Sequence, residues 1–266
     1  MISNNVLYHY TSFDTALKIL NSSSLRFNNI RNQIDPNEYT KGNLSTWFAS
    51  GDDIATADED RNKFNERNES RVKHHQCISF SSNTQIVNDI NVTKLQYILN
   101  EVNKKYNIQE SGFRHYHMQS GFDKSRMWET YADNYSGVCL VLDRRKVIDT
   151  ALVSNITTGY INYLTNFRSV AYDKKKENSL ISQIDNSYFQ KGIDYRDESE
   201  FRLLVNSADV EFFDIKDSIV GIIYGPNSEA KLYKKIVENS FKEFSLNHIE
   251  YAISKNSISN IFYEMN

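Results

Sequence analysis

Tyr195-Arg196-Asp197-Glu198-Ser199-Glu200-Phe201-Arg202 is the stretch that decides the fold prediction, because it places two carboxylates and an arginine at alternate positions. On a strand, side chains two residues apart point to the same face, so Glu198 and Glu200 would lie about 7 Å apart. Two carboxylates at that spacing repel each other unless something neutralises or uses them, and Arg202 continues the same face. The alternative interpretation is a surface strand that carries a Glu-Glu-Arg ladder without any catalytic role.

Two other polar segments end predicted strands further upstream. Tyr8-His9-Tyr10-Thr11-Ser12 closes a β-branched and aromatic strand over residues 6–11, and Ser79-Phe80-Ser81-Ser82 closes a strand over residues 77–81. Residues that bind and catalyse are often carried where elements end and loops begin. We therefore expect His9, Ser79 or Ser81, and Glu200 to converge on one cleft.

The order of the predicted elements indicates an α+β fold. Residues 137–142 read as a buried strand, and residues 201–205 and 210–215 read as a pair of strands. Strands and helices alternate irregularly, which argues against a regular doubly wound sheet. With 2 Pro, 9 Gly and no internal repeat, no domain boundary is evident. The prediction is a single domain over residues 1–266, with the charge-rich residues 51–76 as an exposed helix or mobile insertion.

Composition and charge exclude several classes of protein. The net charge of −3 gives no whole-protein attraction to nucleic acid, although 31 Lys and Arg leave room for a local basic groove. The N-terminus lacks the basic and apolar regions of a signal peptide, and no apolar run approaches the roughly 20 residues of a membrane helix. We expect a cytoplasmic protein without a membrane partner. Cys77 and Cys139 lie in apolar stretches and are predicted to be buried and reduced.

Several familiar motifs are missing. Neither G-x-G-x-x-G nor G-x-x-x-x-G-K-[ST] occurs, so any NAD would be bound without a Rossmann turn. H-E-x-x-H, G-x-S-x-G and paired C-x-x-C motifs are also absent. His74-His75 lies in the charged stretch and is interpreted as solvent-exposed, while His115 and His117 have no third ligand in view. The sequence therefore predicts no metal site.

Motifs from about residue 6 to about residue 225 resemble a widespread, poorly characterised bacterial family. In chain order they are Tyr8-His9-Tyr10, Asp35-Pro36-Asn37-Glu38, Cys77-Ile78-Ser79-Phe80-Ser81, Met127-Trp128-Glu129-Thr130-Tyr131-Ala132 followed by Gly137-Val138-Cys139, and Tyr195 to Arg202. That family in turn resembles the ADP-ribosyltransferase superfamily, in which three strands supply a His or Arg, a Ser-x-Ser or Tyr, and a Glu. The resemblance implies a split core of mixed and antiparallel strands with flanking helices.

The resemblance also implies roles for individual residues, with NAD as a co-substrate. Glu200 would stabilise the oxocarbenium-like state that forms when the nicotinamide–ribose bond breaks, and Glu198 would orient or deprotonate the acceptor. His9 would bind a ribose hydroxyl. The other residues implied in binding NAD are Tyr10 or Tyr131 as a stacking ring, Thr11, and the bracing hydroxyls of Ser79 and Ser81. The three-residue spacing of Trp128 and Tyr131 is ordinary for a core helix face, so Trp128 is predicted to be core.

Similar single-domain bacterial enzymes are often toxins of toxin–antitoxin or anti-phage defence systems, so the resemblance implies such a function, with an antitoxin protein as a possible partner. The Glu-x-Glu pair resembles enzymes that modify arginine, whereas a His at the first position resembles enzymes that modify nucleic acid bases. We favour RNA or single-stranded DNA as the acceptor over protein. Two alternatives stay open: an NAD glycohydrolase with water as the acceptor, and a catalytically inert module that binds a nucleotide or a partner.

Overall fold

The computed structural model describes residues 5–30, 59, 62–66, 69, 73–94, 97, 121–165, 186–252 and 261–264. Over these residues the protein is an α+β fold built on a nine-stranded mixed sheet. The strands of this central sheet lie in the order β15 (Ile261–Glu264), β14 (Asn247–Ala252), β13 (Ile219–Tyr224), β7 (Val138–Asp143), β1 (Val6–Thr11), β4 (His75–Ser82), β11 (Glu200–Asn206) and β8 (Thr157–Tyr160), with β3 (Asn28–Asn29) paired to β4. Only β13 and β14 run parallel among these pairs.

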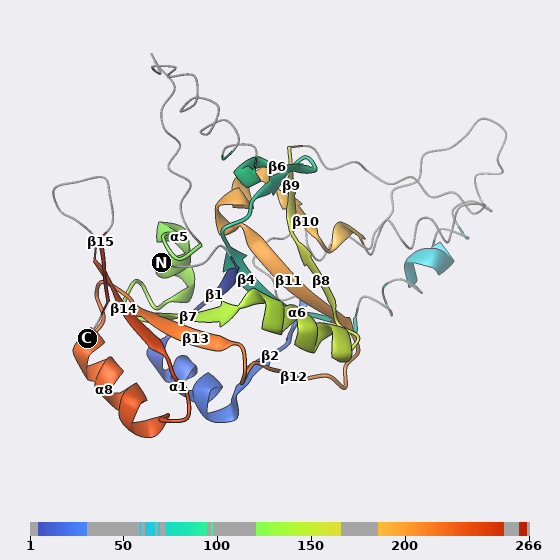
Figure 1. Ribbon diagram of the computed structural model, residues 1–266. Helices are drawn as coiled ribbons and strands as arrows, with labels where there is room; N and C mark the ends of the chain where they lie inside the picture. Colours follow the sequence, from blue (N-terminus) through green and yellow to red (C-terminus); the bar gives the residue numbers. More distant parts are fainter. Residues whose placement is uncertain are drawn as a thin grey trace, which may run out of the picture.

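Smaller strands and several helices surround the central sheet (Figure 1). A second sheet has the order β10 (Gln190–Gly192), β9 (Asn162–Leu164), β5 (Ile86–Val87) and β6 (Ile90–Asn91), and β2 (Ser24–Arg26) pairs with β12 (Phe212–Asp214). The helices are α1 (Phe13–Ser22), α5 (Ser125–Tyr131), α6 (Arg144–Val153), α8 (Ala230–Ser240) and the 3-10 helix η3 (Ile193–Glu198). The chain thus alternates between elements irregularly, as the sequence predicted.

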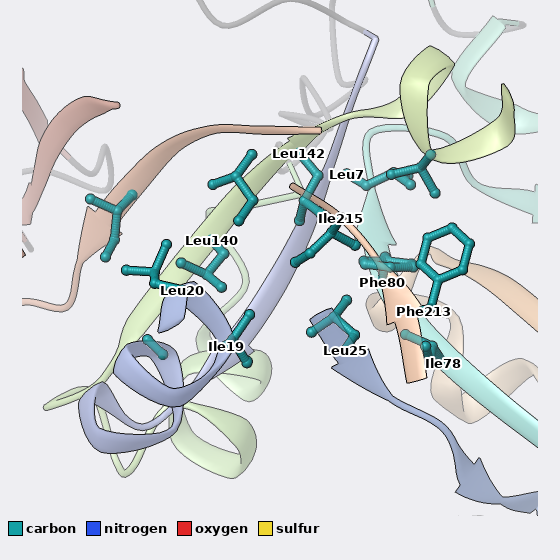
Figure 2. Packing of buried hydrophobic residues seen from close by; sticks show 14 of the residues in the cluster. Leu7, Ile19, Leu20, Leu25, Ile78, Phe80, Leu140, Leu142, Phe213 and Ile215 are labelled. Carbon is teal, nitrogen blue, oxygen red and sulfur yellow. The ribbon is translucent and has the colours of Figure 1, made fainter. Parts of the chain in front are cut away.

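Side-chain alternation gives the central sheet two buried faces. Leu7 of β1 and Leu140 of β7 belong to a large apolar cluster, which α1, α6 and α8 cover. Figure 2 shows Leu7, Leu140 and Leu142 packed near Leu20 and Ile215 in this cluster. Their sequence neighbours Tyr8 and Cys139 point to the opposite face and pack in a second cluster around Trp128 of α5. In Figure 1, α1 and α8 lie on one side of β7 and β13, and α5 lies on the other.

Local sequence signals explain where two of these helices begin. Ser12 precedes α1, and its hydroxyl accepts a hydrogen bond from the backbone N–H of Thr15 at 3.3 Å. Asp143 ends β7 and caps α6, because its carboxylate accepts from the N–H of Arg145 at 2.8 Å. Each cap satisfies a helix N–H group that would otherwise lack a partner, so the strand-to-helix turns are fixed by single polar side chains.

Within the described residues, the edge of β4 that faces β1 is paired with other strands along only part of its length. One edge of β4 pairs continuously with β11, from His75 to Ser81. Its other edge pairs with β1 at Ser81 and Ser82, and with β3 at Gln76 and Cys77. In the part of the sheet that the structure describes, Ile78–Phe80 therefore has no strand partner on this side, and we call this segment the window. The sheet splits here because β1 leaves β4 to continue along β7.

The structure confirms the burial of both cysteines, the burial of Trp128 and a strand over residues 201–205, but it contradicts the predicted pairing of that strand. Cys77 and Cys139 are buried free thiols, and Trp128 is fully buried. Residues 201–205 form a strand, but it pairs with β4 and β8 and not with the strand predicted over 210–215. That later segment pairs with β2, because buried Phe213 packs against Phe27 in the large cluster.

The predicted insertion over residues 51–76 lies mostly outside the described residues. Residues 59, 62–66 and 69 are helical, and β4 already begins at His75. Within the described part of the chain, no helix has the length and apolar character that a membrane crossing requires.

Leu140→Ala should lower the free energy of unfolding by about 2–5 kcal/mol, because Leu140 is fully buried in the centre of the large cluster. Leu152→Ala deletes the same atoms from a side chain that is 66% exposed, and should change stability by less than about 0.5 kcal/mol. Urea unfolding of both variants and the wild type measures these differences. Equal losses for the two variants would contradict the assignment of the core.

Candidate functional site

A cleft of about 170 Å³ lies at the window. Its walls come from β1 and β4, from β2 and β3, and from α5, β10, η3 and the start of β11. The side chains and backbone that line it are those of Tyr8, His9, Tyr10, Arg26, Asn28, Cys77, Ile78, Ser79, Phe80, Ser81, Met127, Tyr131, Lys191, Glu198 and Glu200. The cleft therefore exists because two neighbouring strands of one sheet diverge and expose a polar edge.

The structure brings together seven of the eight site residues predicted from the sequence. His9, Tyr10, Ser79, Ser81, Tyr131, Glu198 and Glu200 all line the cleft. Thr11 does not line it, because β1 has by then moved away along β7, where Thr11 pairs with Val138. Residues 9, 79 and 200 lie far apart in the chain and meet here, as the order of strand ends led us to expect.

Glu198 is not on a strand, which corrects the sequence prediction. It ends the 3-10 helix η3, and Ser199 follows in the left-handed conformation with φ of 40°. Only then does β11 begin, at Glu200. Because of the sharp turn at Ser199, both carboxylates contact the same ammonium group, that of Lys191. On the predicted strand they would lie side by side on one face.

Glu200 is the centre of a buried ionic network. Its Oε1 accepts from the hydroxyl of Ser79 at 2.5 Å and from Nε of Arg202 at 2.6 Å. Its Oε2 forms an ion pair with Nζ of Lys191 at 2.7 Å, and its backbone N–H donates to the hydroxyl of Tyr163 at 2.9 Å. Arg202 is fully buried and donates in turn to the backbone carbonyl of Tyr188 at 2.6 Å. Both oxygens and the backbone of Glu200 are thus held in place.

Lys191 joins the two carboxylates, and the sequence prediction missed it. Its ammonium contacts Oε2 of Glu198 at 2.7 Å as well as Oε2 of Glu200 at 2.7 Å. The side chains of Lys191 and Glu198 are each 6% exposed, and that of Glu200 is 3% exposed. The interpretation as a solvent-exposed Glu-Glu-Arg ladder is therefore wrong, since these groups are buried and Arg202 is inaccessible.

The two carboxylates differ in their tendency to hold a proton. Burial by itself would raise the pKa of Glu200, but Arg202 and Lys191 beside it hold that pKa well below its ordinary value. Burial raises the pKa of Glu198, the neighbouring charge of Glu200 raises it further, and Lys191 offsets only part of this. Glu200 is consequently a fixed negative charge, whereas Glu198 holds a proton more readily than Glu200 does.

The end of β4 holds the backbone of the Glu198–Ser199 turn. The hydroxyl of Ser81 donates to the carbonyl of Glu198 at 2.9 Å, and the hydroxyl of Ser82 donates to the carbonyl of Ser199 at 2.7 Å. Buried Lys124, which the sequence prediction also missed, donates to the Glu198 carbonyl at 2.9 Å. Burial lowers the pKa of Lys124 to about 7. Ser81 therefore contacts the site through this backbone and positions Glu198.

His9 fills the window with a neutral imidazole. Its side chain hydrogen-bonds the backbone of Ser79, the middle residue of the window, and its ring meets Phe80 edge-on at 6.0 Å. Burial lowers the pKa of His9 to about 4. An uncharged imidazole keeps one N–H donor and one acceptor nitrogen, so His9 can hydrogen-bond a ligand hydroxyl at neutral pH.

Of the two candidate stacking rings, Tyr131 is the available one. Tyr10 packs against Trp128 at 5.1 Å, and its hydroxyl donates to the carbonyl of Gly121 at 2.6 Å, so its ring belongs to the core. Tyr131 ends α5 with 36% of its surface exposed and lines the cleft. Burial against the site raises the pKa of Tyr131 to about 12.

Within the described residues, no group of three or more His, Cys, Asp or Glu side chains is arranged to hold a metal ion. His74 is exposed, but its neighbour His75 is buried and stacks on Tyr188 at 4.6 Å, so the expectation of two exposed histidines is wrong for His75. His75 begins β4 and points into the protein there. His115, His117 and the Asp35–Glu38 motif lie outside the described residues.

Comparison with known protein families gives a match over part of the chain. Residues 127–203 match a family described as protein of unknown function (DUF2971). No curated protein matches the chain. The matched segment runs from α5 to β11 and carries Tyr131, Lys191, both glutamates and Arg202, while His9 and the serines of β4 lie outside it.

The unfolding free energy of the wild type should fall as the pH drops from about 6.5 towards about 4, in part because of His9. In this range the unfolded chain binds a proton on His9 and the folded protein does not, so protonation favours unfolding. His9→Gln should show a shallower pH dependence over the same window, measured by urea unfolding at a series of pH values. An unchanged slope would mean that His9 is not held neutral in the folded protein.

Proposed function

We propose that this protein is an NAD-dependent ADP-ribosyltransferase whose active site is the cleft at the window. One observation supports this above others: His9, Ser79 and the Glu198/Glu200 pair come from three separate parts of the chain and converge where the sheet splits. The resemblance to the ADP-ribosyltransferase superfamily implies a split sheet that carries these residue types in this chain order.

The size and lining of the cleft suit the reacting end of NAD as a substrate. Its volume of about 170 Å³ is below the roughly 300–1,000 Å³ of pockets that bury a drug-sized ligand, so the cleft would hold the nicotinamide and its ribose. Tyr131 offers a ring to stack on the nicotinamide. His9 offers its neutral imidazole to a ribose hydroxyl.

In the first chemical step, the bond between C1′ of the ribose and the nicotinamide nitrogen breaks. Its electron pair leaves with neutral nicotinamide, and positive charge develops on the ribose. A fixed carboxylate nearby stabilises that charge without reorganising, and Glu200 suits this role because Ser79 and Arg202 hold it ionised and oriented. Its Oε2 forms the ion pair with Lys191 at the wall of the cleft.

In the second step, the acceptor attacks C1′ and gives up a proton. Glu198 suits the role of general base, because burial raises its pKa and so makes it a stronger base than an ordinary carboxylate. Environments that push the pKa values of two neighbouring carboxylates apart are a known basis for assigning different roles to them. We therefore assign cation stabilisation to Glu200 and acceptor activation to Glu198.

We further propose that the acceptor is RNA or single-stranded DNA and that the protein acts as a bacterial toxin or anti-phage effector in the cytoplasm. Local charge supports a nucleic acid acceptor, although the net charge is −3. Arg26 lines the cleft, and Arg126 lies nearby with its guanidinium 4.9 Å from the ring centre of Tyr195. Such basic side chains suit contacts with a phosphate backbone.

Glu200→Gln should reduce both nicotinamide release and transfer by on the order of a hundredfold or more, because the ribose cation loses its charge partner. Glu198→Gln should lose transfer to the acceptor and keep slow release of nicotinamide, because water can still capture the cation. Glu243→Gln removes an exposed carboxylate that does not line the cleft and serves as a matched control. The assays are nicotinamide release and labelling of total RNA, DNA and protein.

The two glutamate variants also separate the rival functions. Loss of nicotinamide release in Glu200→Gln without any acceptor labelling in the wild type would identify an NAD glycohydrolase. If folded Glu198→Gln and Glu200→Gln both match the wild type in both assays, the cluster is structural and the protein is a binding module. Circular dichroism establishes whether each variant is folded.

Expression of the wild type alone should arrest bacterial growth, and Glu200→Gln should relieve the arrest at equal protein levels. Glu243→Gln should arrest growth as the wild type does, because its carboxylate is exposed and lies outside the cleft. Growth curves together with quantitative immunoblots measure the effect. Normal growth with the wild type would remove the toxin proposal and leave the enzymatic proposal to the assays above.

A further inference from the structure

We propose that Lys191 is a positioning residue for Glu198, and that its ammonium keeps this buried carboxylate ionised and therefore able to accept a proton from the acceptor. The inference deepens the proposed function and rests on it for the role of Glu198. It adds to the site a group from the short strand β10, in addition to the three segments that the sequence singled out.

The geometry makes Lys191 the dominant cation at Glu198. Its Nζ lies 2.7 Å from Oε2 of Glu198, and the two side chains are each 6% exposed, so solvent screens the interaction little. The same ammonium lies 2.7 Å from Glu200, but Glu200 also has Arg202 at 2.6 Å and the hydroxyl of Ser79 at 2.5 Å. Removal of Lys191 therefore leaves Glu200 neutralised and leaves Glu198 without its contacting cation.

Other charged and titratable groups also face this pair, and they determine what remains when Lys191 is removed. They are Lys124 ahead of α5, Arg126 and Tyr131 of α5, Tyr163 of β9, Tyr195 of η3, and Glu200 of β11. Behind these groups, Asp197 of η3 interacts with Lys124, and Arg202 pairs with Glu200. Of the cations, Arg126 lowers the pKa of Glu198 less than Lys191 does. Glu200 and burial both raise that pKa, so Glu198 should take up a proton once Lys191 is gone.

The direct test follows the protonation of Glu198 and needs no enzymatic activity. In protein labelled with ¹³C at glutamate side-chain carboxyls, the Glu198 signal is assigned by its absence in Glu198→Gln. Lys191→Met should raise the titration midpoint of Glu198 by about one pH unit or more, because a contacting opposite charge is lost. Lys191→Arg keeps the charge and should leave the midpoint close to that of the wild type. Arg126→Met is the matched control and should raise it by less than Lys191→Met.

Lys191→Met creates an uncompensated buried carboxylate, so the protein can lose its fold. In that case the double variant Lys191→Met/Glu198→Gln should fold again, because it no longer contains the unpaired charge. A midpoint in Lys191→Met equal to the wild type would overturn the inference. So would an unfolded Lys191→Met protein that Glu198→Gln does not restore.

In the activity assay, Lys191→Met should resemble Glu198→Gln at neutral pH: transfer falls more than nicotinamide release, and transfer recovers as the pH is raised. Adding Lys191→Met to Glu198→Gln should lower transfer little further. If the wild type releases no nicotinamide, the proposed function fails while the titration still decides whether Lys191 controls Glu198. If nicotinamide is released but transfer by Lys191→Met has the same pH dependence on the acid side as transfer by the wild type, the positioning role is wrong and the enzyme assignment stands.

Discussion

A guanidinium with no access to water is the constraint on which the rest of the site depends. Arg202 is fully buried in β11, and a buried charge is tolerated only when it is paired and hydrogen-bonded. Glu200 supplies the pair and the Tyr188 carbonyl supplies a further acceptor. Removing one partner of such a buried pair typically lowers the free energy of unfolding by about 3–5 kcal/mol. The position of Glu200 is therefore fixed by folding stability as well as by any catalytic role. Lys191 then balances the second carboxylate, and the four charges sum to zero.

Because the sheet splits, this buried ionic network borders a cleft. If β1 continued beside β4, a ladder of backbone hydrogen bonds would close the edge of Ile78–Phe80. Instead β1 follows β7 and β3 takes up the far end of β4. His9 occupies the gap with one hydrogen bond to Ser79, and the polar face of β4 becomes a wall of the cleft. Burial of the imidazole lowers the pKa of His9 to about 4, so His9 is neutral in this place at neutral pH.

The sequence predicted the parts of the site that lie in patterned strands. Alternation of polar and apolar residues in Cys77–Ser81 and the apolar run 137–142 indicated strands, and the polar residues at their ends marked the cleft. Two features escaped this reasoning for physical reasons. Ser199 adopts a left-handed conformation that a serine rarely takes, so Glu198 was placed on a strand. Lys191 lies in the three-residue strand β10, which is too short to carry a pattern, and its role comes only from tertiary packing.

We propose that this cleft splits NAD and passes ADP-ribose to a macromolecule. The most direct test is incubation of the protein and total cell extract with NAD that carries one label on the nicotinamide and another on the adenylate. We expect the labels to separate: free nicotinamide appears, and the adenylate label enters macromolecules from which nuclease, and not protease, releases it. If both labels stay together on intact NAD while the folded protein is present, the claim is contradicted.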